Sequence, residues 1–175
     1  MKTRKIIGYG LLALITILYF IPKTNLYYQL EHTLQPHGVI IHNEHVDDKW
    51  FWLEVTNAQL YVQKIESLYV KKTRIILFGA YNRVDFESIL LASTLGQFVP
   101  KKIEAATLRY ALYNPFNVNG TILGEFGHAE IKVNLYDGVL TAKIEASELM
   151  KSKFSATLGN FTRDKKGVYH YEYRF

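Results

Sequence analysis

The chain has 175 residues, of which 49% are apolar, and it contains no cysteine. This length suits one folded domain with a single core, and a chain without cysteine has neither disulfides nor thiolate chemistry. The formal net charge is +5, and subtracting the three charges of Lys2, Arg4 and Lys5 at the amino terminus leaves +2 for the rest. The other basic residues form short, separated clusters typical of solvated loops, so we expect no nucleic-acid binding.

The amino-terminal segment predicts a membrane anchor. Residues 6–21, IIGYGLLALITILYFI, carry no charged side chain and directly follow the basic residues. No small-residue cleavage site follows them, so we expect an uncleaved signal anchor, a transmembrane helix over residues 6–22. Its 16 uncharged residues rise about 24 Å, short of a hydrocarbon core of about 30 Å, so Pro22 and the aromatic flank must complete the span. The alternative is a buried core helix of a soluble protein.

The residues on either side of this anchor predict its orientation. Tyr19, Tyr27 and Tyr28 are amphipathic rings of the kind that lie at a membrane surface. Basic residues concentrate on the cytoplasmic side of single-pass proteins, so we expect residues 1–5 to form a cytoplasmic tail. The chain from Lys23 onward would then lie across the membrane. These features predict a protein of the bacterial inner membrane with a periplasmic domain.

Residues 23–37 predict an amphipathic linking helix. Thr24 is a candidate N-cap, and Leu26, Leu30 and Leu34 recur at four-residue spacing before a Pro-His-Gly stop at residues 36–38. A helix lying on an anionic membrane would carry lysine or arginine on its polar face, and the polar face of this helix has neither. We therefore expect the leucine stripe to pack on the domain's own sheet.

Residues 38–175 predict a β-rich α+β domain, a curved antiparallel sheet with two or three flanking helices. Helices are expected over residues 85–98, where Phe86, Ile89 and Leu90 fit one face, and over residues 147–158. Short β-rich runs surround the first of these helices. They cover residues 39–41, 51–56, 60–62, 74–81 and 101–113.

The most regular strand pattern lies between residues 114 and 147. Apolar and polar residues alternate on both sides of Tyr136-Asp137-Gly138, and Asp-Gly accepts the positive φ that tight hairpin turns require. Glycines at positions 120, 124 and 127 lack the Lys-Ser/Thr of a phosphate loop and instead favour a bulge or close backbone approach. The alternation along this hairpin places its apolar side chains on one face of the sheet. Its central members are Ile131, Val133, Leu140 and Ile144.

The last predicted strand carries aromatic residues on one face. Tyr169, Tyr171 and Tyr173 alternate with polar residues up to Phe175. Packing in the core is the favoured interpretation, whereas an exposed stripe would mark a partner site. With the hairpin face, these three tyrosines form the candidate binding face.

No pattern of residues predicts catalysis, a cofactor or a metal site. The most suggestive group is His37, His42, Glu44 and His45, but alternation along a strand directs His42 and His45 to opposite faces. No nucleophile and base, and no pair of spaced carboxylates, can be nominated. We therefore expect a protein that is not an enzyme and holds no metal or cofactor.

Three segments carry a resemblance to known envelope proteins. They are IPKTNLYYQLEHTLQPHGVII after the anchor, NAQLYVQKI, and GTILGEFGHAEIKVNL, within residues 20–147. Their arrangement resembles that of the type II secretion protein N family and, more broadly, AsmA-like bacterial envelope proteins. The resemblance implies an inner-membrane protein with a periplasmic β domain that assists protein transport, secretion machinery or envelope lipid traffic, with no catalytic residues.

Two functions follow as hypotheses. In the first, the domain is a scaffold or assembly component that docks onto other envelope or secretion proteins by edge pairing or an apolar patch. In the second, the apolar face binds or transfers lipid. The scaffold is favoured, because the helices expected over residues 85–98 and 147–158 carry enough apolar residues to cover one face of the sheet, whereas a lipid-binding face must stay accessible.

Overall fold

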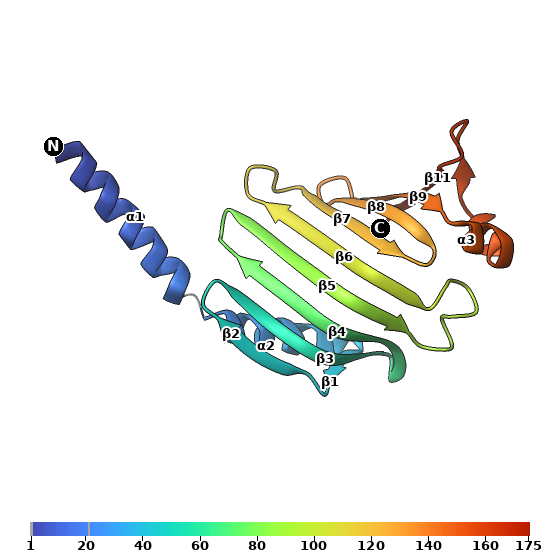
Figure 1. Cartoon of the computed structure of the whole chain (residues 1–175), viewed down its shortest axis with the longest axis horizontal. Coiled ribbons are helices and arrows are strands. Elements are labelled where there is room, and N and C mark those ends of the chain that lie inside the picture. The colour runs from blue at the N-terminus through green and yellow to red at the C-terminus, as the bar shows by residue number, and fades with distance from the viewer. Residues whose placement is uncertain (1, 21) are drawn as a thin grey trace.

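A computed structural model of the chain describes residues 2–20 and 22–175, except for some side chains of the first helix. The fold is mainly β, as predicted: a sheet of 11 antiparallel strands in the described residues, with helices near two of its ends (Figure 1). The side chains of Lys2, Arg4, Lys5 and Tyr19 lie outside the described part. Predictions that depend on those four side chains are therefore untested.

The strands form an almost sequential meander. The order is β1-β3-β4-β5-β6-β7-β8-β9-β11-β10, and β2 pairs with the other half of the β3 edge that holds β1. Strands expected separately over residues 51–56 and 60–62 are one continuous strand, β3. The bounds are β1 Val39–His42, β2 His45–Lys49, β3 Trp52–Val62, β4 Ile65–Leu77, β5 Tyr81–Leu91, β6 Lys102–Ala111, β7 Asn117–Gly124, β8 Gly127–Asn134, β9 Val139–Ala146, β10 Thr162–Arg163 and β11 Tyr169–Arg174.

The first helix, α1, spans Lys2–Phe20 and extends away from the sheet (Figure 1). Within the described residues, no helix has both the length and the apolarity required to cross a membrane. The expectation of a transmembrane helix is therefore not supported. Helix α1 begins at Lys2 and therefore includes the basic residues that were assigned to a separate tail. Its uncharged part, from Ile6 to Phe20, rises only about 22 Å.

The linking helix forms as expected but begins differently. It comprises α2, Lys23–Leu34, and a 3-10 turn η1, Gln35–His37, which ends at Gly38 with a left-handed φ of +79°. Pro22 occupies the N-cap position and no side chain caps the helix, so the predicted cap at Thr24 is wrong. Proline supplies an N-terminal boundary without a hydrogen bond because its fixed φ is compatible with a helix start.

The helix predicted over residues 85–98 is wrong. Residues 81–91 form strand β5, and residues 93–98 are turns. The spacing of three between Phe86 and Ile89 imitates a helical face, but Ser88 between them has a φ of +54° and interrupts the strand. Such an irregularity advances the alternation by one residue and keeps both apolar side chains on one face.

The same irregularity continues through the neighbouring strands. One residue in each of the strands β3, β4 and β6 lacks a paired partner in the sheet, as Ser88 does in β5. These residues are Asn57, which has a φ of +59°, Lys71 and Glu104. The apolar residues on the two sides of this line still share a face, because Ala58 and Val70 line the same cavity as residues 53, 55 and 73. A spacing of three therefore occurs in each of four adjacent strands.

The predicted hairpin and its glycines are confirmed. Residues 135–138 connect β8 and β9, and Gly138 has a φ of +62°. A Cβ atom on Gly124 would lie 2.8 Å from the carbonyl oxygen of Lys102, next to the bulge in β6. Close backbone approach is thus the reason that glycine is required there.

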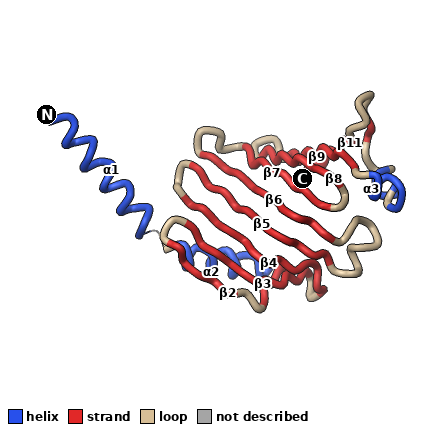
Figure 2. Tube along the Cα trace, in the orientation of Figure 1, coloured by secondary structure: helices blue, strands red, loops and turns tan. Residues whose placement is uncertain are grey.

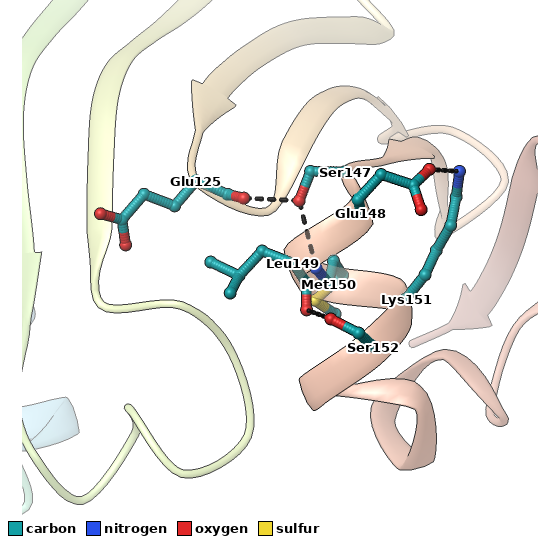
Figure 3. A network of polar contacts seen from close by, with 7 residues as sticks. All are labelled: Glu125, Ser147, Glu148, Leu149, Met150, Lys151 and Ser152. Carbon is teal, nitrogen blue, oxygen red and sulfur yellow. Dashed lines mark hydrogen bonds and ion pairs between the residues drawn. The ribbon is translucent and has the colours of Figure 1, made fainter.

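The carboxy-terminal helix is confirmed but divided. It consists of α3, Glu148–Lys153, and α4, Ser155–Leu158, separated by Phe154 in a non-helical conformation. The Ser147 hydroxyl accepts from the Met150 N–H at 3.1 Å and donates to the Glu125 carbonyl at 2.6 Å (Figure 3). This capping residue therefore also ties the helix to the β7–β8 turn.

Candidate apolar groove

Apolar residues form continuous rows across the sheet. Residues that face each other on adjacent antiparallel strands project from the same side of the sheet. Two rows of this kind run from β3 to β11. The first row is Leu53, Ile75, Val84, Leu108, Gly120, Ile131, Ala142 and Tyr171, and the second is Val55, Thr73, Phe86, Ala106, Ile122, Ala129, Ile144 and Tyr169.

Within the described chain, helices lie beside the sheet near its two ends. Helix α2 packs against β1, β2 and β3, and α3 packs against β9 (Figure 2). Under α2, Tyr27 joins Leu53, Val55 and Ala58 in a buried cluster. The missing helix of residues 85–98 leaves the central strands without the cover that the sequence predicted.

A cavity of about 540 Å³ lies where α2 meets the open part of the face. This volume is within the range of about 300–1,000 Å³ typical of ligand sites. It is lined by Lys23, Leu26, Tyr27, Leu30, Ile41, Leu53, Val55, Ala58, Leu60, Val70, Thr73, Ile75, Leu77, Val84, Phe86 and Leu108, which we call the apolar groove. Among the described residues that line it, Lys23 is the only one with a charged side chain.

The charge of Lys23 is compensated within the protein. The side chain is 2% exposed, and its Nζ lies 3.0 Å from an Asp48 carboxylate oxygen on β2. A buried ammonium requires such a partner because desolvation is costly. The ion pair therefore fixes the start of α2 against β2 at one end of the groove.

Tyr27 is the second polar group at this end. Its hydroxyl is buried and has no hydrogen-bond partner among the described residues. Burial raises the pKa of the Tyr27 phenol far above its ordinary value, and the nearby carboxylates of Glu44 and Glu31 raise it further. The phenol therefore stays neutral, and the expectation that Tyr27 lies at a membrane surface is wrong because the ring packs in the core. Tyr28, in contrast, is exposed.

The structure brings together the predicted binding face. Ile131, Ile144, Tyr169 and Tyr171 belong to the two rows, while Val133, Leu140 and Tyr173 oppose one another in a third. Tyr171 and Tyr173 are exposed, so they do not pack in the core as favoured from the sequence. This part of the face is continuous with the groove.

Sequence reasoning missed the groove's central residues. Phe86 was assigned to a helix, and neither Val84 nor Leu108 was given a role. The signal that could have identified them is the repeated spacing of three, found in β3, β4, β5 and β6 alike. An amphipathic helix repeats spacings of three and four within one segment, whereas here a single spacing of three interrupts the alternation in each of four successive segments.

The histidine group does not assemble into a metal site. Within the described residues, no three potential ligands among His, Cys, Asp and Glu converge. His42 instead packs edge to face on Tyr61 at 5.5 Å between ring centroids. Glu31 and Glu44 lie beside it in a second cavity, where burial and then Glu44 raise the pKa of Glu31 while His42 lowers it.

Comparison with known proteins returned no match among family models, curated proteins or solved structures.

Proposed function

We propose that the protein is a non-enzymatic envelope module that binds an extended apolar chain, such as a lipid acyl chain, in the apolar groove. The observation that supports this most is the apolar face left uncovered between α2 and α3. If helices covered this face, it would be ordinary core, and the scaffold hypothesis would be preferred. Left open, it offers a site for an apolar ligand.

The groove's chemistry favours an acyl chain over a polar ligand. Apart from Thr73, the Tyr27 hydroxyl and the paired Lys23, its lining is hydrocarbon and aromatic carbon. Each Å² of apolar surface that a ligand hides there contributes about 25 cal/mol. A polar ligand would lose its hydration without finding partners for its hydrogen bonds.

We also propose the location predicted from the sequence, with the amino terminus in the cytoplasm and the domain in the periplasm at the bacterial inner membrane. Exposed apolar side chains along α1, among them Ile6, Ile7 and Leu12, support membrane attachment. The resemblance to secretion protein N and AsmA-like proteins points to envelope assembly or lipid traffic.

A scaffold is the second candidate, and the edge of β11 favours it. Strand β10 pairs only with residues 169 and 170. In the described chain, no strand therefore pairs with residues 171–174 on that side. An unpaired edge with exposed aromatic residues can accept a strand from another protein. The two functions are compatible, because the edge and the groove are different surfaces.

A pair of leucines on opposite faces of the sheet tests the lipid proposal. Leu108 lines the groove and is 40% exposed, whereas Leu123 on β7 projects from the other face and is 48% exposed. Both sites can hydrate an aspartate, so both variants should fold. Leu108→Asp should lose co-purifying lipid, measured by mass spectrometry after detergent exchange, and Leu123→Asp should keep it.

The full chain in detergent is the sample, with circular dichroism as the check on folding. Equal lipid content in wild type and both variants would show that the groove is not the lipid site. A wild-type protein without lipid, together with strand-dependent capture of an envelope protein that Glu172→Pro abolishes, would favour the scaffold.

A further inference from the structure

We propose that one rim of the sheet rests on the surface of a lipid bilayer, so that the sheet stands on the membrane with the groove beside it. The aromatic rim comprises residues 50–51, 78–80, 112–116, 135–138 and Phe175. This inference rests on the proposed membrane location, but it makes a separate statement about which surface touches lipid.

The aromatic rim is apolar and exposed. Tyr113 is 85% exposed and Tyr136 is 78% exposed. Among all the rim residues, Asp137 is the only one with a charged side chain. The exposed large apolar residues of the rim are Trp50, Phe51, Phe78, Leu112, Tyr113, Phe116, Leu135, Tyr136 and Phe175.

The turns at the opposite ends of the same strands differ in composition. In an antiparallel meander, alternate turns lie at opposite rims. The far rim consists of residues 63–64, 92–101, 125–126 and 164–168. It carries exposed Leu95 and Phe98 but also six charged residues, Lys64, Lys101, Glu125, Asp164, Lys165 and Lys166. The apolar character therefore belongs to one rim.

Backbone hydrogen bonds join three neighbouring turns of the aromatic rim, those at residues 78–80, 112–116 and 135–138. The Leu112 N–H donates to the Ala80 carbonyl at 2.9 Å, and the Leu135 N–H donates to the Phe116 carbonyl at 2.7 Å. Phe116 and Tyr136 also pack edge to face, with ring centroids 5.4 Å apart. The aromatic side chains are thus presented by adjacent, mutually supported turns.

Helix α1 leaves the domain at this rim. Lys23, at the start of α2, pairs with Asp48, which opposes Leu53 next to the β2–β3 turn. Figure 1 shows the end of α1 beside that turn, with the β4–β5 turn nearby at the same end of the sheet. A membrane that holds α1 would therefore lie closer to this rim than to the far one.

The position and composition of the rim together favour a bilayer over a protein partner. Tyrosine and tryptophan rings suit the boundary between hydrocarbon and water, because each has an apolar body and a polar tip.

This orientation connects the groove with the membrane. Leu77 and Lys23 line the groove, and Leu77 directly precedes Phe78 of the rim. One end of the groove therefore lies next to the aromatic rim. An acyl chain could pass from the bilayer to the groove without crossing the charged far rim.

Single cysteines in the cysteine-free chain test the inference. Tyr113→Cys and Tyr136→Cys place a polarity-sensitive fluorophore on the aromatic rim. Phe98→Cys replaces a matched aromatic residue, 56% exposed, on the far rim. The full chain is reconstituted into vesicles of phosphatidylethanolamine and phosphatidylglycerol, with flotation to measure binding and spin-labelled lipids as quenchers.

We expect blue-shifted, lipid-quenched emission from both rim positions and aqueous emission from position 98. If the protein floats with the vesicles while positions 113 and 136 remain aqueous, the rim inference is wrong and the membrane location stands. If the protein does not float at all, both proposals fail. Equal quenching at all three positions would also overturn the inference, because the domain would then contact lipid without a preferred rim.

Discussion

The backbone N–H of Phe175 donates to the carbonyl oxygen of Gly138 at 2.9 Å, which joins the last residue of the chain to the β8–β9 turn. A Cβ atom on Gly138 would lie 2.7 Å from the Phe175 carbonyl oxygen. Glycine at this position therefore serves both the positive φ of the turn and the close approach of the carboxy-terminal strand.

Gly138→Val should destabilise the protein by more than about 1 kcal/mol, because the valine meets left-handed backbone and a steric clash. Gly79→Val is the matched control. Gly79 has a φ of +67°, and a Cβ atom there would meet no other atom within 4 Å, so its replacement adds backbone strain alone. Urea unfolding of the full chain in detergent measures both, and an equal loss in the two variants would contradict a role for the Phe175 contact.

Ser88 should be replaceable by glycine with a gain in stability. Its φ of +54° is unfavourable for serine. Glycine relieves this strain but raises the conformational entropy of the unfolded chain, so the net gain in stability should be about 0.5 kcal/mol. Ala142→Gly, in a regular part of β9, should instead cost about 0.5–1 kcal/mol. A loss of stability at both sites, measured by thermal unfolding, would show that the line of irregular residues is not strained at Ser88.

Removing Asp48 should destabilise the fold by about 2 kcal/mol, because it leaves the buried ammonium of Lys23 without its carboxylate. Lys23→Met combined with Asp48→Asn should recover most of the loss, since methionine fits an apolar groove. The surface pair Lys151–Glu148, at 2.8 Å, provides the comparison. Glu148→Gln should have a much smaller effect. If removing Asp48 and replacing Glu148 lowered the free energy of chemical unfolding equally, the result would argue that Lys23 is well hydrated.

Asp164 should contribute to acid sensitivity. The backbone N–H of Val168 and then the His170 ring, 3.2 Å from the carboxylate, lower the pKa of Asp164 from its ordinary value of 3.8. Because the folded-state pKa is the lower one, the stabilisation is fully present above pH 3.8 and is lost as the pH falls through the folded value.

Asp164→Asn should therefore lower stability at neutral pH and remove this part of the acid dependence. The free energy of unfolding of wild type and variant, measured from neutral pH down into the acid range, tests this difference in stability. Carbon-13 titration should also show that His170→Phe raises the pKa of Asp164 only part of the way, because the larger contribution is the Val168 N–H. A full return to 3.8 in His170→Phe would assign the shift to the ring instead.

The sequence alone determined the elements whose signals are local. Alternation around Asp137-Gly138 specified the β8–β9 hairpin, Ser147 specified the cap of α3, and Gly38 specified the end of the linking helix. Each depends on backbone preferences of a few consecutive residues, so no distant contact was needed. The shared face of Ile131 and Val133 followed from the same alternation.

Only the tertiary structure decided the state of residues 85–98. Phe86 and Ile89 have a spacing that fits a helix or an interrupted strand equally well, and pairing with β4 and β6 selects the strand. Tyr27 illustrates the same limit, because its burial depends on Leu53, which is distant in sequence. The open groove is a consequence of these long-range choices: residues 85–98 entered the sheet and therefore could not cover it.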